Sequence, residues 1–365
     1  MMQSGKSPAA TVLTIIFCLM FILSACAPAV STTKEATPTN GTVVMNKPLI
    51  THMYTADPSA HVFEGKIYIY PSHDRDEHTG RPASDNLGSQ YDMVDYHVFS
   101  MDNMQTPPVD HGEVLHVKDV PWAEKQMWAP DAAFKNDTYY LYFPALDHEG
   151  IFRIGVATSK SPAGPFEAEP DYIPGSFSMD PCVFVDDDGQ AYMYFGGLMG
   201  GQLERWQTGE YDPNGEIPGP GKPMLGPRVA KMSEDMLGFD GPVKEISILD
   251  EDGKPVDAGD QTKLFFEASW MHKYNGTYYF SYSTGFSRYL AYATGESPLG
   301  PFTFRGQLLS PVLGWTTHHS IVEFDGKWYL FYHDATLSGG VDHMRNVKVA
   351  ELFYNEDGSI KLIKP

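Results

Sequence analysis

The chain repeats one short hydrophobic and polar pattern five times. In each copy a hydrophobic segment leads into a two-residue polar turn, and a tyrosine follows three positions after the second turn residue. Asn-Gly and Asp-Gly pairs accept the positive φ that a two-residue hairpin requires, and flanking aromatic and β-branched residues favour strands. The pattern therefore predicts five β-hairpins. Their turns and tyrosines are Glu64-Gly65 with Tyr68, Asn136-Asp137 with Tyr140, Asp188-Gly189 with Tyr192, Asn275-Gly276 with Tyr279, and Asp325-Gly326 with Tyr329.

The spacing of the hairpins indicates a larger repeated unit. Successive tyrosines are 72, 52, 87 and 50 residues apart, which is enough for four strands and their loops. Residues 157–166 (ATSKSPAGPF) and 293–302 (ATGESPLGPF) also match, so the repeat extends beyond the hairpin. Such units are typical of propeller blades, whereas an open β-sandwich, the alternative, does not repeat internal motifs in this way. The sequence predicts one all-β domain, a five-bladed β-propeller over residues 47–365, with long excursions between residues 197 and 263.

One polar or functional residue precedes every turn, eight or nine positions before the second turn residue. These residues are Asp57, Trp128, Asp180, Glu267 and His318. Because the innermost strands of a propeller line its axis, we expect the five side chains to converge on one pocket. Three carboxylates around a small cavity suggest acid and base hydrolysis of a glycosidic bond. A like-charged neighbour raises a carboxyl pKa, so one of the three can stay protonated as the acid.

Each candidate also has a structural interpretation. Asp57 and Asp180 both precede a proline, and Asp-Pro pairs are common in turns. Glu267 lies between apolar neighbours, where an unpaired carboxylate would be costly, and this favours a functional role. Asp131 is only six positions before its turn, out of step with the others. We therefore expect Trp128 to form a pocket wall against the sugar and Asp131 to be structural.

Charge limits the class of ligand. With 47 acidic and 26 basic residues, the chain has a formal net charge of −21. This charge opposes binding to nucleic acid or to an anionic membrane surface and suits a neutral ligand such as an oligosaccharide. No feature of the sequence indicates a protein partner.

The N-terminus predicts export. Lys6 precedes an apolar run over residues 12–23, and residues 23–26 (LSAC) resemble the lipobox of bacterial lipoproteins. The resemblance implies a signal peptide over residues 1–25 and lipidation of Cys26, which would anchor the protein to the cell envelope and be its one membrane contact. A plain signal peptide with an incidental cysteine is the alternative. Residues 26–46 are rich in Thr, Pro, Ala and Ser and predict a flexible tether.

Cysteine usage agrees with this interpretation. Cys18 falls in the signal peptide and Cys26 at the lipidation site, which leaves Cys182 alone in the domain. We therefore expect neither an intramolecular disulfide nor a cysteine-based metal site in the mature chain.

Five short motifs, in order and in step with the hairpins, resemble those of glycoside hydrolase family 43. They are residues 55–59 (TADPS), 128–131 (WAPD), 179–181 (MDP), 266–268 (FEA) and 318–320 (HHS). The resemblance covers the chain after the tether and implies an inverting hydrolase. It makes Asp57 the general base, Glu267 the general acid and Asp180 the carboxylate that adjusts the pKa of the acid. Inversion requires the base and acid carboxyls to stand about 6.5–9.5 Å apart.

The resemblance also assigns residues around this triad. His318 would face the axis and contact a calcium ion through its water shell, or else form hydrogen bonds there with no ion. Calcium prefers oxygen ligands, so we expect no directly bound ion and no required cofactor. Arg345 would reach substrate hydroxyls, with a surface salt bridge as the alternative. His73 follows the first hairpin and is expected to line the pocket.

The stretches 53–58 (MYTADP) and 95–100 (DYHVFS) look most like family members that act on xylose and arabinose. They imply an exo-acting hydrolase that removes terminal β-D-xylosyl or α-L-arabinofuranosyl units from plant-wall oligosaccharides such as xylan fragments. The sequence does not separate these two activities. Two alternatives remain: an endo-arabinanase with an open groove, and a carbohydrate-binding propeller lipoprotein with an inactive site.

Overall fold

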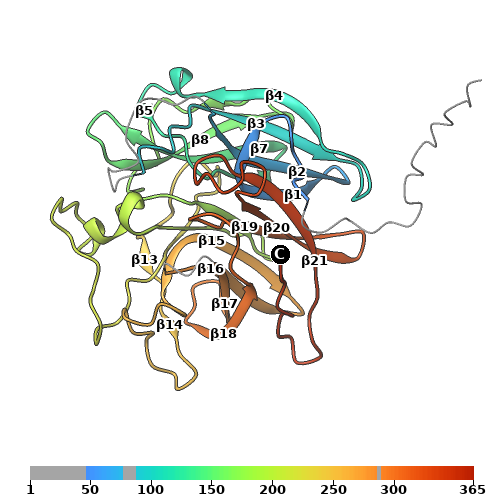
Figure 1. Cartoon of the computed structure of the whole chain (residues 1–365). Helices are drawn as coiled ribbons and strands as arrows, with labels where there is room; N and C mark the ends of the chain where they lie inside the picture. The colour runs from blue at the N-terminus through green and yellow to red at the C-terminus, as the bar shows by residue number, and fades with distance from the viewer. Residues whose placement is uncertain (1–46, 77–87, 286–288) are drawn as a thin grey trace, which may run out of the picture. The chain divides into compact units, whose positions relative to one another are not determined.

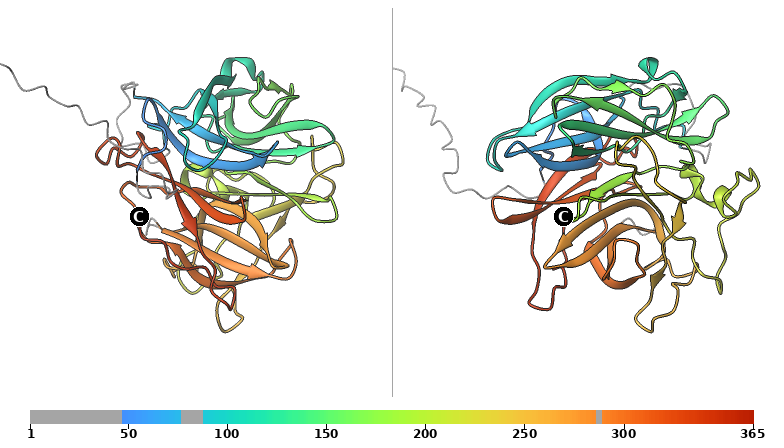
Figure 2. Two further views of the ribbon diagram at one scale, coloured as in Figure 1. Left: turned by 90° about the vertical axis from the view of Figure 1, so that its right-hand side faces the viewer. Right: turned by 180° about the vertical axis from the view of Figure 1, so that it is seen from behind.

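The strands of the protein form five sheets in the computed structural model, which describes residues 47–76, 88–285 and 289–365. Each sheet extends from an innermost strand, and these five strands contact one another in a closed ring (Figures 1 and 2). In order around the ring they are β1 (Tyr54–Phe63), β6 (Asp131–Lys135), β10 (Cys182–Val185), β15 (Phe265–Tyr274) and β19 (His319–Phe324), which returns to β1. The predicted five-bladed β-propeller is confirmed.

The outer strands follow the innermost strand in sequence order, except for β5 in blade 2 and β14 in blade 4. Blade 1 adds β2 (Lys66–Asp74), β3 (Asp95–Met101) and β4 (Val109–His116). Blade 2 adds β7 (Thr138–Asp147), β8 (Phe152–Ser159) and β9 (Glu167–Ala168), and β5 (Ala123–Lys125) also pairs with β7. Blade 3 adds β11 (Ala191–Phe195), β12 (Arg228–Lys231) and β13 (Lys244–Glu245). Blade 4 adds β16 (Thr277–Thr284), β17 (Tyr289–Gly295) and β18 (Phe302–Leu309), and β14 (Ile248–Leu249) pairs parallel with β18. Blade 5 adds β20 (Lys327–Asp334) and β21 (Asn346–Leu352). Short 3-10 turns are η1 (Val117–Asp119), η2 (Met199–Gly201) and η3 (Leu203–Trp206).

All five predicted hairpins join the two innermost strands of a blade. Four have the expected two-residue turn, with both turn residues at positive φ, as at Asn275 (48°) and Gly276 (79°). The third differs, because β10 ends at Val185 and the Asp186 amide donates to the Gln190 carbonyl at 2.9 Å. Asp188-Gly189 is therefore part of a longer loop, in which only the glycine has positive φ.

Tyrosines from the second strand of each blade fill the space between blades. Tyr70, Tyr142, Tyr194, Tyr282 and Tyr332 are all fully buried. Two of them explain the repeated SPxGPF motif: Tyr70 donates to the Pro162 carbonyl at 2.6 Å, and Tyr194 donates to the Pro298 carbonyl at 2.8 Å. A buried phenol needs such a partner. The motif therefore links blade 1 to blade 2 and blade 3 to blade 4 in the same way.

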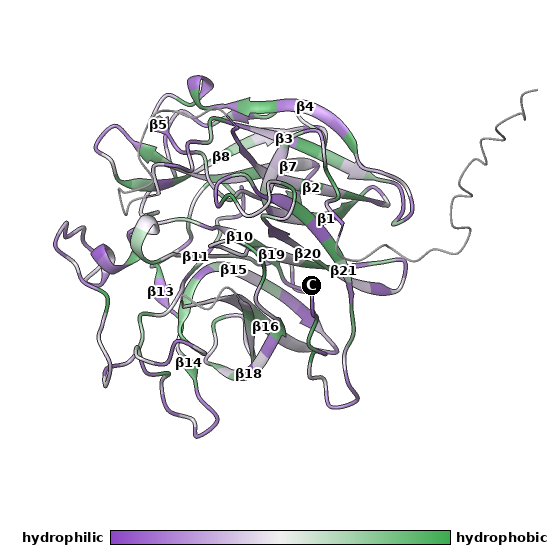
Figure 3. Ribbon diagram, in the orientation of Figure 1, coloured by the Kyte–Doolittle hydropathy of each residue, from purple (hydrophilic) through white to green (hydrophobic). Residues whose placement is uncertain are grey.

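The first and last parts of the domain meet in blade 5. The amides of Leu49 and Thr55 donate to the carbonyls of Val347 and Arg345 at 2.7 and 3.0 Å. The segment before β1 thus runs beside β21, and the blue and red strands lie together in Figure 1. Hydrophobic residues concentrate on the strands and hydrophilic residues on the loops (Figure 3).

The expected signal peptide (1–25), lipidated Cys26 and tether (26–46) lie outside the described residues. Within the described residues, no helix has the length and apolar character to cross a membrane. Cys182 is buried and carries a free thiol.

Candidate active site

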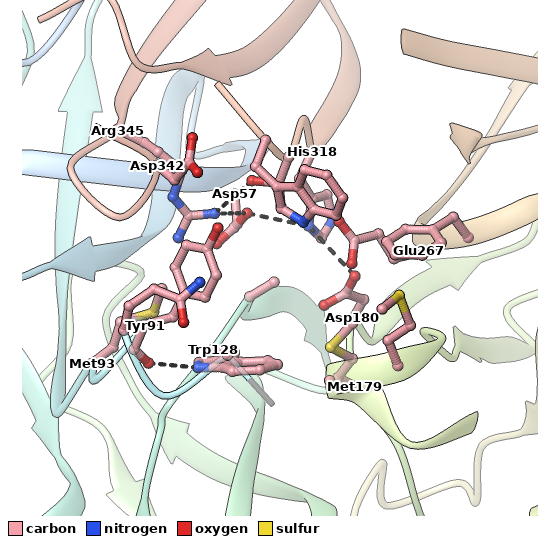
Figure 4. A pocket seen from close by; sticks show the side chains of 18 of the residues that line it. Asp57, Tyr91, Met93, Trp128, Met179, Asp180, Glu267, His318, Asp342 and Arg345 are labelled. Atoms are coloured by element: carbon pink, nitrogen blue, oxygen red, sulfur yellow. Dashed lines mark hydrogen bonds and ion pairs between the residues drawn. The ribbon is translucent and has the colours of Figure 1, made fainter. Parts of the chain in front are cut away.

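A cavity of about 210 Å³ lies at the centre of the ring and receives a side chain from every blade. The five residues selected by the sequence pattern, Asp57, Trp128, Asp180, Glu267 and His318, all line it (Figure 4). The excursion after β11 contributes Leu198, Met199 and Gly200 to one wall. Residues separated by more than 250 positions thus share one site because each occupies the start of an inner strand.

Asp57 lies at an irregularity in β1. The β1–β2 register shifts between Ala56 and Ser59, and Asp57 has φ 48°, a conformation that is uncommon outside glycine. Its Oδ2 accepts a hydrogen bond from Ser72 at 2.6 Å, and its Oδ1 lies 3.2 Å from Nη1 of Arg345. Burial alone would raise its pKa, but Arg345, followed by His333 and His318, outweighs burial and holds the pKa of Asp57 well below its usual range. The carboxylate is therefore ionised, as a base requires.

Glu267 has the opposite electrostatic environment. The register of β15 shifts on both sides of it, and the next residue, Ala268, has φ 65°. Burial raises the pKa of Glu267 well above its usual value, and the charges of Asp180 and Asp57 raise it further. These effects favour the protonated form of Glu267, which a general acid requires.

Asp180 connects the other two carboxyls. Its Oδ2 accepts a hydrogen bond from the amide of Ala268 at 2.8 Å, which ties it to the residue after Glu267. The carboxyl groups of Asp180 and Glu267 point toward one another in Figure 4. Burial raises the pKa of Asp180 to about 6, with His318 opposing and Asp57 adding to the rise. Asp180 is thus placed to raise the pKa of Glu267.

Arg345 lies between Asp57 and a second aspartate. Its Nε and Nη2 donate to the two oxygens of Asp74 at 2.8 and 2.7 Å, and its guanidinium lies 4.9 Å from the centre of the Tyr91 ring. Only 4% of Arg345 is exposed, which excludes the surface salt bridge. Arg345 lines the cavity, and its guanidinium contacts Asp57, Asp74, Thr316 and Tyr91.

Sequence reasoning missed Asp74, His333 and Ser72. Asp74 and Ser72 are two residues apart on β2, so they share one face, and both reach the site from it. His333 accepts a hydrogen bond at Nδ1 from the amide of Asp57 at 3.0 Å and lowers the pKa of that carboxyl. The period-two spacing of Ser72 and Asp74 was a usable signal. The phase of the strand relative to the axis was not visible in the sequence.

His73 is placed outside the cavity, contrary to expectation. It lies between Ser72 and Asp74 on β2, and successive side chains of a strand point to opposite faces. Its Nδ1 is instead 2.5 Å from Oδ1 of Asp95. The structure therefore assigns His73 no contact with this pocket.

Trp128 and Asp131 have the two different roles that the hairpin spacing predicts, pocket wall and structural residue. Trp128 lines the cavity, donates from Nε1 to the Tyr91 carbonyl at 2.7 Å and packs against Phe152. Asp131 is 1% exposed, contacts Ser59 and His61 of β1 and accepts from the amide of Val183. It joins three blades behind the pocket, which is a structural role.

His318 lies beside two of the carboxylates, with its Nδ1 3.6 Å from Asp57 and 3.8 Å from Asp180. Among the described residues, the one group of three or more His, Cys, Asp or Glu with ligand atoms within 4.8 Å of one another lies in blade 1 and does not include His318. An ion held through water at His318 remains compatible with these positions.

The chain is similar to proteins of one family. The family model described as glycosyl hydrolases family 43 matches residues 45–360. The chain is 62% identical to xylosidase/arabinosidase 43A of Humicola insolens and 53% identical to a xylosidase/arabinosidase of Bacteroides ovatus; the matches cover 87% and 85% of this chain and 99% and 95% of those proteins.

Solved structures agree. The crystal structure of CoXyl43, a β-xylosidase/α-arabinofuranosidase from a compost microbial metagenome, shares 60% identity with a TM-score of 0.86, over 89% of this chain and 98% of that one. That structure holds xylotriose and is a calcium-free form. A Xanthomonas citri enzyme complexed with xylotriose shares 52% identity with a TM-score of 0.83, over 87% of this chain and 93% of that one. The fold, the site and these similarities show that the chain belongs to glycosyl hydrolase family 43.

Proposed function

We propose that this glycoside hydrolase removes terminal β-D-xylosyl and α-L-arabinofuranosyl residues from xylo-oligosaccharides, with inversion of the anomeric carbon. One observation carries the proposal: the cavity holds an aspartate whose pKa is depressed and a glutamate whose pKa is raised. Two carboxyls held in opposite protonation states are what acid and base hydrolysis of a glycoside needs. The names of the xylosidase/arabinosidase relatives support the substrate class.

In the proposed reaction Asp57 removes a proton from a water molecule as the water attacks the anomeric carbon. Glu267 donates its proton to the leaving glycosidic oxygen as the bond breaks. Asp180 raises the pKa of Glu267 and fixes its position through the amide of Ala268. Arg345 keeps Asp57 ionised before water is activated. Proton exchange with solvent then restores both carboxyls.

The size of the cavity favours exo action. At about 210 Å³ it is smaller than the roughly 300–1,000 Å³ of a pocket for a drug-sized ligand, so it suits one sugar unit at its base. An endo-arabinanase would need an open groove for a polymer. The binding-only alternative predicts a missing carboxylate, whereas all three are in the cavity.

Replacement of Glu267 by Gln tests the assignment of the acid. We expect kcat on xylobiose to fall by about 10²–10⁴-fold, because the leaving oxygen receives no proton. Dinitrophenyl β-xyloside, whose leaving group needs little protonation, should lose much less. Glu356→Gln changes an exposed glutamate and serves as the control. Equal losses on both substrates, or unchanged turnover, would contradict the role of Glu267.

We propose that any calcium ion bound by this protein lies near His318. The calcium-free form named for the related crystal structure makes calcium binding relevant to this chain. His318 would face the ion through water, and the ion would supply positive charge that favours the ionised form of Asp57. Thermal unfolding with calcium and with EGTA would detect such an ion without recourse to activity.

We also propose that the protein is exported and anchored at the cell envelope. The lipobox-like residues 23–26 support export and lipidation of Cys26, followed by anchoring to the bacterial cell envelope. The composition of residues 26–46 supports a tether that holds the propeller away from the membrane. Detergent-phase partition of the wild type and of Cys26→Ala tests the anchor, and recovery of both in the aqueous phase would contradict it.

A further inference from the structure

A second cluster of ligand-type side chains lies in blade 1, outside the catalytic cavity. His73, Asp95 and His97 each offer one ligand atom, and these atoms lie within 4.8 Å of one another. The β2–β3 register pairs Ser72 with Tyr96, so the next positions, His73 and Asp95, face one another across the two strands. His97 is two residues after Asp95 and therefore projects from the same face of β3. None of the three lines the catalytic cavity.

The surroundings of His97 resemble a supported metal ligand. Its Nδ1 lies 3.1 Å from Oδ1 of Asp110, which leaves Nε2 as the ring nitrogen available to an ion. The other oxygen of Asp110 lies 2.8 Å from Nε2 of His52. Metal-binding histidines usually donate their second ring nitrogen to a carboxylate, which fixes the tautomer and the ring orientation. Asp110 provides this support.

The three side chains are also partly shielded from solvent. Asp95, His97 and His73 expose 12%, 17% and 21% of their side-chain surface. Such positions restrict the rotamers of the ligands but leave one side open to water. The ring centroids of His73 and His97 are 5.2 Å apart, and the rings meet edge to face instead of stacking.

We propose that His73, Asp95 and His97 bind a divalent transition-metal ion, Zn²⁺ foremost, at a site in blade 1. Two imidazoles and one carboxylate form a ligand set that Zn²⁺ accepts, with water in the fourth position. Calcium and magnesium prefer oxygen ligands and are disfavoured here. The site is distinct from any calcium at His318, because it shares no residue with the axis.

The bound ion would strengthen the closure of the propeller. It would join β2 to β3, and the contacts from His97 through Asp110 to His52 would extend the effect to the segment before β1. That segment is the one whose Leu49 amide bonds to Val347 of blade 5. The expected consequence is a more stable fold, with the catalytic constants unchanged.

Zinc titration of the full mature chain tests the site. The protein is purified without a polyhistidine tag, treated with EDTA and titrated with ZnCl₂ by calorimetry, with CaCl₂ as the comparison ion. We expect one equivalent of Zn²⁺ to bind and to raise Tm. His97→Gln should lose this equivalent and the rise in Tm, and Asp110→Asn should weaken binding by about 10–100-fold. His148→Gln, an exposed histidine elsewhere, is the matched control and should bind as the wild type does.

Two results would overturn the proposal. One is a wild-type protein that binds no Zn²⁺ under these conditions. The other is a His97→Gln variant that binds Zn²⁺ with the wild-type stoichiometry and affinity, which would place the ion elsewhere, for example among the catalytic carboxylates. Circular dichroism of the apo variants and their kcat/KM on xylobiose establish that the fold and the active site are intact, so a loss of binding reports on the ligands.

Discussion

Nη1 of Arg345 lies 3.2 Å from Oδ1 of Asp57, and at most 8% of either side chain is exposed. In such a place the positive charge stabilises the ionised carboxylate strongly, because little water screens the pair. The pair therefore explains why Asp57 has a depressed pKa although it is buried.

Removal of this charge should move the acidic limb of the pH–rate profile. In Arg345→Gln the pKa of Asp57 rises, so activity is lost at a higher pH as the solution is acidified. A shift of about 1–3 units in the limb of kcat/KM is expected. Arg305→Gln changes an exposed arginine and is the control. Since the variant also leaves Asp74 without its bidentate partner, thermal unfolding must be measured beside it. An unmoved acidic limb in a folded variant would rule out this role of Arg345.

The basic limb should respond to Asp180. Asp180→Asn removes a negative charge beside Glu267 but keeps an oxygen that can accept from the Ala268 amide. The pKa of Glu267 then falls, and because the acid must be protonated, activity is lost at a lower pH as the solution is made alkaline. We expect the limb to move down by about 1 unit. A limb that stays in place would mean that burial alone sets the pKa of Glu267.

The anomer released first tests the proposed inversion. Asp57 and Glu267 come from the first and fourth blades, and inversion needs about 6.5–9.5 Å between their carboxyls for a water molecule. Proton NMR during hydrolysis of an aryl β-xyloside should show α-xylose first, with the β-anomer appearing later by mutarotation. Early β-xylose would indicate retention and a covalent intermediate.

Acid stability should depend on His272. This histidine is buried, its Nε2 lies 2.7 Å from the Tyr354 hydroxyl, and burial lowers its pKa to about 3. The unfolded chain takes up the proton near pH 6.5 and the folded chain does not, so stability falls as the pH drops from about 6.5 toward 3. The loss is about 1.4 kcal/mol per pH unit for one such histidine.

Chemical unfolding between pH 7 and pH 5 measures this loss. His272→Gln should have lower stability at pH 7, but a shallower decline toward pH 5 than the wild type. The exposed His148→Gln should decline as the wild type does. Parallel declines in all three proteins would assign the acid sensitivity to other groups.

The hairpins could be predicted because their determinants are local. Turn residues that accept positive φ and the apolar segments around them specify each hairpin, and their repetition along the chain specified five blades. The constant spacing to the hairpin turn placed five residues at equivalent positions in the repeat, and the repeat therefore predicted that they meet in one cavity. These residues are Asp57, Trp128, Asp180, Glu267 and His318. The prediction of a two-residue turn at Asp188-Gly189 was wrong in detail. A backbone hydrogen bond between Asp186 and Gln190 closes a longer loop there.

The sequence by itself thus determined the number of blades and the residues that face the axis, because both follow from a pattern within each repeat. Only the tertiary structure decided the protonation of those residues and the place of His73. The phase of β2 sends Ser72 and Asp74 to the site and His73 to Asp95. A carboxyl pKa depends on burial and on charges brought from other blades, so Asp57 and Glu267 acquire opposite shifts only once the ring is closed.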